Sequence, residues 1–382
     1  MTAPPHISLF SGAMGLDLGL EAAGFRTLAA VELDRAARET IRLNAPPQLA
    51  LFSDVQQVTA EDLLAATGLR RGEVTLVSGG PPCQPFSTAG RREALNDPRG
   101  SLFRDFLRLV DGLQPRFFVM ENVRGLLSAT LKHRPIAERG SVLTSPALTP
   151  EEQRGSAFEV ILSEFRRIGY SFEYGLLNAA DYGTPQTRER VVILGSRDGE
   201  ALSLPAPTHS RGGLNLPDRL TLRDGLHDLH DPEPRFQPYS EARLKFLRLV
   251  PEGGNWRSLP PELLPEAMGG AYHSGGGKVG FYRRLSWDRP APTVTTSPAQ
   301  KATDMCHPSQ NRPLSVREVA RLQGFPDTWQ FCGSLSDQYR QIGNAVPTQL
   351  GRAIGLTLMA ALEGQTVQAA TAQQPTLLEL PA

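Results

Sequence analysis

The sequence predicts an α/β protein built on an open, mostly parallel β-sheet that helices cover on both faces. Two observations lead to this fold class. Several short apolar runs, each suited to a buried strand, alternate with amphipathic helical patterns between residues 6 and 196. Acidic residues and one cysteine follow several of these runs, at the strand ends where ligands bind in such sheets. After residue 196 frequent prolines interrupt the pattern, so we expect a smaller, irregular second domain there.

The N-terminal part indicates a strand, a tight turn, a helix and a second strand that ends in an acid. The strands are expected over residues 6–10 and 27–31 and the helix over 16–23, with Gly12 and Gly15 in the turn. Glu32 follows about 20 positions after Gly12, the spacing at which nucleotide-binding folds place a carboxylate on ribose hydroxyls. The turn has fewer glycines than a dinucleotide fingerprint, which fits a ligand without a pyrophosphate. An ordinary βαβ unit is the alternative.

Two further strand ends carry candidate site residues. Asp54 ends a short apolar segment, where it can accept a hydrogen bond from the exocyclic amine of an adenine ring; a helix-capping aspartate is the common alternative. Cys83 stands in the segment GGPPCQPFS, after a strand expected over residues 74–78. The prolines restrict the backbone around the thiol, and a rigid, accessible cysteine suits a nucleophile. A buried structural cysteine is the alternative.

Residues 84–123 are expected to form a loop, a helix and a strand. The polar stretch that ends at residue 100 predicts a mobile loop, whose Arg91, Arg92 and Arg99 suit contacts with phosphates, although a solvated loop has the same composition. The helix is expected over residues 101–113 and a buried strand over 117–120. Glu121 follows that apolar strand, so it is either a desolvated carboxylic acid or the partner of a nearby arginine.

Two arginines precede the last strand of this part of the chain. After a helix over residues 158–168 and a strand over 170–177, the segment QTRER leads into a strand over 191–194. We expect Arg188 and Arg190 to point to opposite faces of the strand entrance. One of them would then reach a ligand site while the other anchors the sheet.

The region after residue 196 has no repeating βα pattern. Its glycine-rich loop leads to Lys278 and Arg283, which we expect to approach a groove; the Ser or Thr of a phosphate-binding loop does not follow the lysine. Ser315 and Glu318 have the spacing of a capping box at the start of a helix. A last helix is expected after Pro347, to about residue 363.

The composition of the chain limits the kinds of ligand, metal site and cellular location that we expect. With 40 basic and 40 acidic side chains the formal net charge is zero, so nucleic-acid binding would depend on local basic patches. Cys83, Cys306 and Cys332 form no C-x-x-C pair, which argues against a zinc site or a disulfide framework. His273 and His307 lack ligand-spaced partners. Without a signal peptide or a membrane-spanning run, the sequence predicts a soluble intracellular protein without a metal site.

A set of short motifs, in order, resembles those of the bacterial-type cytosine-5 DNA methyltransferases. LFSGAMG at residues 9–15 is similar to the family's first cofactor motif, with Met14 where glycine is frequent. PCQPFS at 82–87, ENV at 121–123 and QTRER at 186–190 are similar to the nucleophile, acid and arginine motifs. RPAPTVT at 289–295 and QIGNAVP at 341–347 match the last two. Residues 197–282 correspond to the family's variable target-recognition region, where the resemblance is silent.

The resemblance implies a Rossmann-like, S-adenosylmethionine-dependent methyltransferase fold with a smaller DNA-reading domain and a cleft for duplex DNA. The implied domains span 1–196 and 197–340, and residues 341–363 return to the catalytic domain. The polar composition of residues 364–382 separately predicts a disordered tail. S-adenosylmethionine is the implied methyl donor and S-adenosylhomocysteine its product. The implied cofactor-binding residues are Phe10, Gly12, Gly15, Glu32, Leu33, Asp54, Val55, Pro82, Leu102, Asn344 and Val346. The residues expected to contact DNA are Gln84, Ser87, Arg91, Arg92, Arg99, Lys278 and Arg283.

With that resemblance, the residues suggest covalent chemistry on a flipped-out cytosine. Cys83 would add to carbon 6, and Glu121, if protonated, would donate to ring nitrogen 3 and accept from the exocyclic amine. Arg188 would bind the ring carbonyl oxygen, and Arg190 would support Glu121 or the loop. We expect a cytoplasmic, nucleoid-associated monomer, either the partner of a restriction endonuclease or an orphan. The alternatives are an RNA (tRNA) cytosine-5 methyltransferase and a DNA-binding regulator that has lost catalysis.

Overall fold

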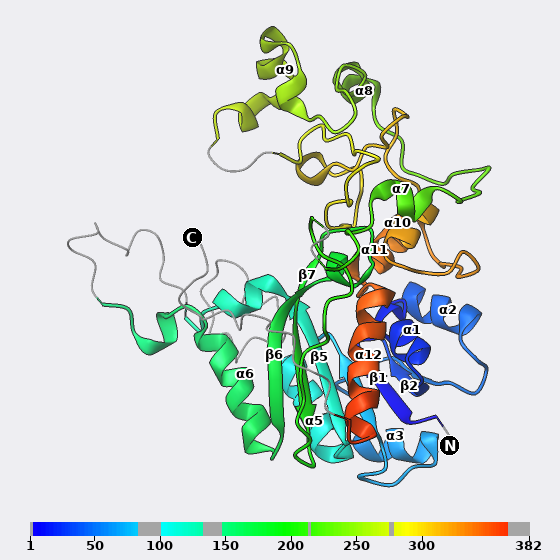
Figure 1. The fold of residues 1–382 in the computed structure, drawn as a ribbon, viewed down its shortest axis with the longest axis vertical. Helices are drawn as coiled ribbons and strands as arrows, with labels where there is room; N and C mark the ends of the chain where they lie inside the picture. Colours follow the sequence, from blue (N-terminus) through cyan, green and yellow to red (C-terminus); the bar gives the residue numbers. More distant parts are fainter. Residues whose placement is uncertain (1–2, 83–100, 133–146, 213–214, 275–278, 366–382) are drawn as a thin grey trace.

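The computed structural model describes residues 3–82, 101–132, 147–212, 215–274 and 279–365. A sheet with long helices forms its lower part, and an irregular region with short helices lies above it (Figure 1). The strands are β1 (Pro5–Leu9), β2 (Arg26–Val31), β3 (Ala50–Phe52), β4 (Leu76–Gly79), β5 (Phe117–Val123), β6 (Ser171–Asn178) and β7 (Glu189–Ser196). The helices beside the sheet are α1 (Gly15–Ala22), α2 (Arg35–Asn44), α3 (Ala60–Thr67), α5 (Ser101–Leu113), α6 (Ser156–Arg167) and α12 (Thr348–Leu362). The others are α7 (Leu222–Leu226), α8 (Glu241–Leu247), α9 (Leu264–Met268), α10 (Val316–Leu322) and α11 (Leu335–Asn344).

The described strands form one sheet in the order β3-β2-β1-β4-β5-β7-β6. β1 to β5 pair in parallel, whereas β7 pairs antiparallel with both β5 and β6. The prediction of an open, mostly parallel sheet is confirmed, and the antiparallel β7 is a feature that the sequence did not reveal. Because β1 is bordered by β2 on one side and by β4 on the other, the order of strands reverses at this point. Such switch points are where ligands bind in α/β sheets.

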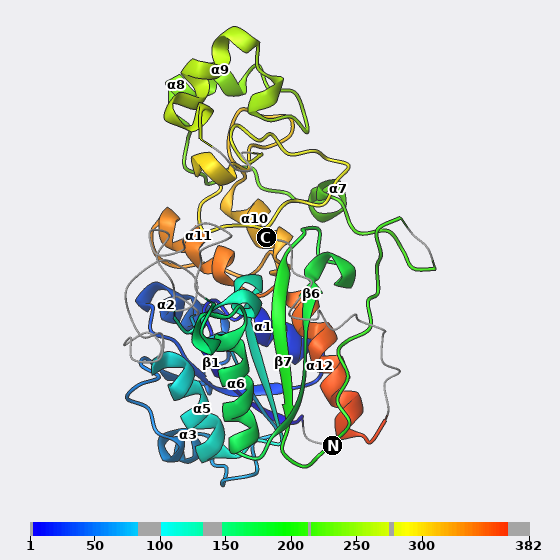
Figure 2. The same ribbon diagram turned by 90° about the vertical axis from the view of Figure 1, so that its left-hand side faces the viewer.

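The side chains of β5 alternate between the two faces of the sheet. Phe118 and Met120 belong to the core that contains residues of α3, α5 and α6, whereas Phe117 and Val119 belong to the core shared with α1 and α12. Alternate side chains of a strand point to opposite faces, so this apolar strand is buried on both sides, as the sequence predicted. Figure 2 shows α5 and α12 on opposite sides of the sheet. Helices therefore cover both faces and leave the carboxyl ends of the parallel strands accessible.

Most helices lie where the sequence predicted them. α5 has the predicted bounds, and the capping box of α10 is present: the Glu318 N–H donates to the Ser315 hydroxyl and the Ser315 N–H to the Glu318 carboxylate. The sequence did not predict five of the described helices, namely α3, α7, α8, α9 and α11. α3 begins with a capping box of Thr59 and Asp62 that could have been recognised, and α11 is short and polar. Among the described residues, no helix combines the length and the apolar character needed to cross a membrane.

The region after residue 196 packs against the first part of the chain through a shared hydrophobic core. This core joins Ala13, Met14 and Ile41 to apolar side chains of α7, α10 and α11. α11 also contacts α2, since the Thr40 hydroxyl donates to Gln341 at 2.7 Å. Helix α11, which the predicted boundary at residue 340 would divide, thus contacts the first part of the chain. The division into domains at residues 196 and 340 stays a prediction.

Helix α12 packs closely against α1, which lies beside it in Figure 1. A Cβ atom at Gly19 of α1 would lie 2.3 Å from the carbonyl oxygen of Thr348 and 2.6 Å from the amide nitrogen of Arg352. Thr348 is the first residue of α12 and Arg352 lies within this helix. Their backbone atoms are fixed by the helix and cannot move aside. Glycine at position 19 therefore allows the C-terminal helix to pack onto the sheet domain.

We expect Gly19→Ala to lower the free energy of unfolding by roughly 1–3 kcal/mol, the usual range for overpacking a close contact. Gly270→Ala is the matched control, because a Cβ atom there would meet no atom within 4 Å. Its effect should stay within ~0.5 kcal/mol. Urea unfolding followed by circular dichroism measures both changes. Equal stability of the two variants would contradict the close packing of α1 and α12.

Candidate active site

A cavity of about 880 Å³ opens at the carboxyl ends of β1, β2, β4 and β5, around the switch point of the sheet. Glu121, Arg188 and Arg190 line it. So does every residue that was predicted to bind a cofactor: Phe10, Gly12, Gly15, Glu32, Leu33, Asp54, Val55, Pro82, Leu102, Asn344 and Val346. The structure therefore brings the cofactor candidates and three of the four catalytic candidates into one space.

The turn after β1 is held by Glu32. One carboxylate oxygen of Glu32 accepts the N–H of Gly12 and the other accepts the N–H of Asp34, both at 2.7 Å. Burial raises the pKa of Glu32 above its ordinary value. A carboxylate offers about four acceptor positions, so Glu32 keeps capacity for further donors, such as the hydroxyl groups of a sugar.

Two non-glycine residues of this turn have a left-handed backbone. Phe10 has φ 57° and Met14 has φ 66°, a conformation that is rare for bulky residues and costs on the order of 1 kcal/mol or more each. Phe10 lies in the cavity wall, and strained residues of this kind often occur at ligand sites. Met14 takes the place where the resemblance expects glycine, and its side chain is buried beside Ala13 and Ile41. That burial offsets the strain.

Two glycines in the cavity wall allow close approaches between segments. A Cβ atom at Gly15 would lie 2.5 Å from the carbonyl oxygen of Val346, and one at Gly80 would lie 2.9 Å from a carboxylate oxygen of Glu121. Gly15 is thus required for the packing of the C-terminal segment as well as being a predicted cofactor residue. Gly80 lets the chain before Cys83 pass next to Glu121.

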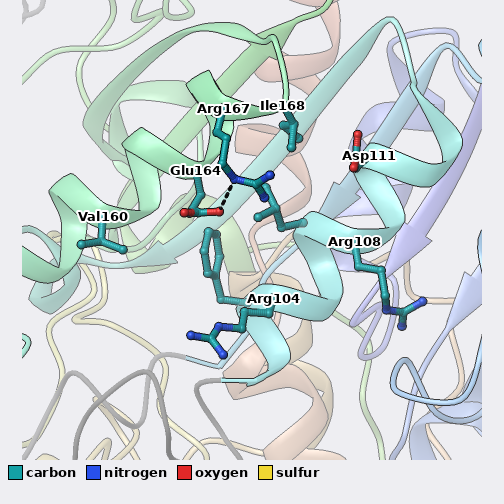
Figure 3. A pocket seen from close by; sticks show the side chains of 9 residues that line it. Arg104, Arg108, Asp111, Val160, Glu164, Arg167 and Ile168 are labelled. Atoms are coloured by element: carbon teal, nitrogen blue, oxygen red, sulfur yellow. Dashed lines mark hydrogen bonds and ion pairs between the residues drawn. The ribbon is translucent and has the colours of Figure 1, made fainter.

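The turn that carries Asp54 and Val55 is fixed from behind by Arg108 of α5. Arg108 donates to the carbonyl oxygens of Val55 at 2.7 Å and of Val58 at 3.0 Å. It also lines a second cavity of about 460 Å³, where Arg104 and Arg108 project from α5 and Glu164 and Arg167 from α6 (Figure 3). One oxygen of the Asp54 carboxylate accepts the N–H of Gln56 at 2.9 Å, a local contact within the turn.

Glu121 forms a charged centre with Arg190. The Arg190 Nε lies 2.5 Å from a Glu121 carboxylate oxygen, and each side chain is 11% exposed. Of the two interpretations left open by the sequence, the pairing with an arginine is the one present in the structure. Glu121 also lies within β5 rather than beyond its end, because the pairing of β5 with β7 extends to Val123.

Arg188 is almost fully buried and joins two of the motif segments. Its guanidinium donates to the carbonyl oxygens of Val294 at 2.8 Å and Gly343 at 2.7 Å, and its Nε has no hydrogen-bond partner among the described residues. Burial, together with the charge of Arg190, lowers the pKa of Arg188. The prediction that Arg188 and Arg190 face opposite ways was wrong, since both line the cavity. Residues two apart in an extended chain share a face.

Cys83 lies outside the described residues, as do Gln84, Ser87, Arg91, Arg92, Arg99 and Lys278. The chain leading to Cys83 is fixed, because the Asn122 side chain donates to the carbonyl oxygen of Pro81 at 2.9 Å, and Pro82 lines the cavity. Arg283 donates to the carbonyl oxygen of Asp304 at 2.8 Å, and burial lowers its pKa. The Arg283 guanidinium thus stabilises the backbone of the region after residue 196. The predicted contact of Arg283 with DNA stays a prediction.

Sequence reasoning missed several residues that line the cavity, namely Ser8, Asp17, Ser78, Arg340 and Gln341. A signal existed for three of them. Ser8 and Ser78 are polar residues within otherwise apolar strands, and Asp17 is an acid in the first turn of a mostly apolar helix.

No group of side chains suited to a metal ion occurs in the described ranges. Cys306 is buried in the second region, where burial raises the pKa of its thiol to about 11. This environment opposes the thiolate form, so Cys306 is unsuited to act as a nucleophile.

Comparison with known proteins identifies the family of this chain. The family model for C-5 cytosine-specific DNA methylases matches residues 5–360. The Type II methyltransferase M.Sau96I of Staphylococcus aureus is 40% identical over 350 residues, which cover 92% of this chain and 74% of that protein. The Type II methyltransferase M.Eco47II of Escherichia coli is 38% identical over 360 residues, which cover 94% of this chain and 79% of that protein. A solved structure described as a prophage-encoded DNA modification methyltransferase of E. coli is 25% identical, with a TM-score of 0.64 and coverages of 94% and 100%. The chain therefore belongs to the C-5 cytosine-specific DNA methylase family and is a DNA (cytosine-5)-methyltransferase.

Proposed function

We propose that this enzyme transfers a methyl group from S-adenosylmethionine to carbon 5 of a cytosine that is flipped out of a specific duplex DNA sequence, through a transient bond from Cys83 to carbon 6. One observation carries the proposal: a single cavity is lined by the cofactor candidates, by Glu121, Arg188 and Arg190, and by Pro82, the residue before Cys83. A methyl donor and a flipped-out cytosine held in this cavity would meet at the carboxyl ends of the parallel strands.

The residues present fit S-adenosylmethionine. Phe10 offers an aromatic ring for the adenine, Asp54 an acceptor for its amine, and Glu32 acceptor capacity for the ribose hydroxyls. A Cβ atom at Gly12 would meet no atom within 4 Å, so the turn leaves open space for the methionine part. When bound, this cofactor supplies an electrophilic methyl group.

The chain's own residues would act on the cytosine. Addition of the Cys83 thiolate to carbon 6 makes carbon 5 nucleophilic enough to take up the methyl group. Loss of the carbon-5 proton then lets the thiolate leave and restores the ring. We assign Glu121, oriented by Arg190, to ring nitrogen 3 and the exocyclic amine, and the Nε–H of Arg188 to the ring carbonyl oxygen.

Glu32→Ala should weaken the binding of S-adenosylmethionine by more than tenfold, at least about 1.4 kcal/mol. The variant removes the proposed ribose acceptor and also releases the N–H groups of Gly12 and Asp34. Isothermal titration calorimetry gives the affinity. Glu39→Gln is the control, because Glu39 pairs with Arg35 on the exposed face of α2. Unchanged affinity in Glu32→Ala would rule out the ribose assignment.

Arg108→Met should weaken the binding of S-adenosylhomocysteine about threefold to tenfold, since each lost hydrogen bond contributes roughly 1 kcal/mol. Methionine keeps the aliphatic stem but cannot hold the carbonyl oxygens of the turn that carries Asp54. Arg104→Met is the control from the same wall of the second cavity (Figure 3), and it should bind like the parent. If both variants bind alike, Arg108 does not position this turn.

We further propose that residues 197–282 select the target sequence, and that the enzyme acts on nucleoid DNA in the bacterial cytoplasm, alone or with a restriction endonuclease. The naming of bacterial relatives as Type II methyltransferases supports this setting. Sequencing bisulfite-treated DNA from an expressing host would give the target and the methylated position.

Incubation of the enzyme with a methyl-labelled donor and either duplex DNA or tRNA tests which nucleic acid is the substrate. We expect label in carbon 5 of cytosine in the DNA alone. Label in tRNA without label in DNA would contradict the proposal, and its absence from both under single-turnover conditions would favour a regulator that has lost catalysis.

A further inference from the structure

A cluster of polar side chains is buried between the sheet and the first turn of α1. His6 and Ser8 lie on β1, Ser78 on β4 and Asp17 on α1, and none of them is more than 2% exposed. Buried polar groups are costly unless each finds a hydrogen-bond partner. The proposed methyl-transfer steps do not use this cluster, so its retention within the core needs another explanation.

The histidine of the cluster is satisfied, whereas the aspartate is not. The His6 ring nitrogens lie 3.1 Å from the Thr27 hydroxyl and 2.8 Å from the Ser78 hydroxyl. The Ser8 side chain is a hydrogen-bond partner of the Asp17 carboxyl group. The Asp17 Oδ1 atom lies 3.9 Å from His6 and has no hydrogen-bond partner within the described part of the chain. Asp17 is one of the residues that line the 880 Å³ cavity, together with Gly12 and Gly15.

We propose that Asp17 is a specificity-determining residue that favours the cationic methyl donor over the neutral product. This inference rests on the proposed use of S-adenosylmethionine. The donor has one positive charge more than S-adenosylhomocysteine, because its sulfur is a sulfonium. A carboxylate within a water-poor wall of the cavity interacts with that extra charge more strongly than a solvated one would. The product lacks the charge, so it gains no such stabilisation and is released more readily.

The charges around Asp17 leave it free for this role. Burial lowers the pKa of His6 to about 3, so the ring is neutral near pH 7 and provides no counter-ion. The other charged groups that act on Asp17 are Glu21 of the same helix and Glu32 beside the turn, both acids. Burial raises the pKa of Asp17 to about 7. Since the carboxylate forms above that pKa, donor affinity should rise with pH through about 7, while product affinity should stay level.

Calorimetry with the full chain and no DNA tests the inference, with S-adenosylmethionine and S-adenosylhomocysteine as ligands between pH 6 and 8. At pH 8, Asp17→Asn should weaken donor binding at least fivefold, change product binding less than twofold, and abolish the rise of donor affinity with pH. Glu21→Gln, a neighbouring exposed acid on α1, should keep the parent's ratio of the two affinities.

A second measurement does not depend on the variant. In the parent enzyme at pH 7, donor binding should release a fraction of a proton, seen as a difference in heat between buffers of unlike ionisation enthalpy, and product binding should release none. Equal proton release for both ligands, or equal weakening of both in Asp17→Asn, would overturn this inference alone. If the parent bound neither ligand, the proposed donor itself would be wrong.

Discussion

Arg190→Met is expected to lower the rate of methyl transfer by at least about 100-fold while leaving the affinity for S-adenosylhomocysteine unchanged. The Arg190 Nε lies 2.5 Å from the Glu121 carboxylate, and both side chains are largely buried. Removing one partner of such a pair leaves an uncompensated charge, which usually costs 3–5 kcal/mol. A 100-fold loss corresponds to about 2.7 kcal/mol, so it is a conservative expectation.

The reason for this loss is the geometry of Glu121. Without Arg190, the carboxyl group is free to turn away or to seek water, and it no longer meets ring nitrogen 3 in a fixed orientation. Single-turnover methylation of duplex DNA measures the effect. Arg167→Met is the control, since Arg167 pairs with Glu164 on the exposed face of α6 and such pairs contribute little. A rate in Arg190→Met within fivefold of the parent would contradict the role given to the ion pair.

Cys83→Ser is expected to reduce turnover by at least about 10⁴-fold, the scale seen when a nucleophile is removed. A serine hydroxyl is far less acidic than a thiol, so it cannot supply the anion that adds to carbon 6. The residues that hold the preceding segment, Asn122 and Pro81, are unchanged in the variant. Binding of S-adenosylhomocysteine should therefore persist. Turnover within tenfold of the parent would exclude Cys83 as the nucleophile.

The sequence was sufficient to predict that the candidate cofactor residues lie together at one edge of the sheet. Phe10, Glu32 and Asp54 each follow a strand of the parallel part of the sheet, and parallel strands present their carboxyl ends at one edge. Local patterns that identify the strands therefore also bring these side chains together. The same reasoning placed Pro82, next to the proposed nucleophile, at that edge.

Features that depend on contacts between distant segments could not be predicted in this way. The antiparallel insertion of β7 beside β5 places Arg190 opposite Val123 and close to Glu121, and no local pattern shows that pairing. The Asp17 Oδ1 atom has no hydrogen-bond partner among the described residues because of the way the sheet and α1 pack together, and no local pattern shows that packing.

The irregular second region shows the same limit. Arg283 and Arg284 have the composition of a basic, DNA-facing loop. Arg284 is instead 6% exposed and donates to the carbonyl oxygens of Leu247, Val250 and His307. The described residues of this region contribute no strand to the sheet, and buried arginines there satisfy backbone carbonyl groups that would otherwise lack donors. Charge in the sequence therefore did not indicate exposure.

Covalent trapping tests the central claim most directly. Duplex DNA with 5-fluorocytosine at the target position is incubated with the enzyme and S-adenosylmethionine. Fluorine at carbon 5 cannot leave as a cation, so methylation proceeds while the release of the thiol does not. We predict a protein–DNA complex that survives denaturing electrophoresis, requires S-adenosylmethionine, forms with Cys306→Ser and Cys332→Ser, and is absent with Cys83→Ser. A Cys83→Ser variant that is trapped as well as the parent would contradict the account.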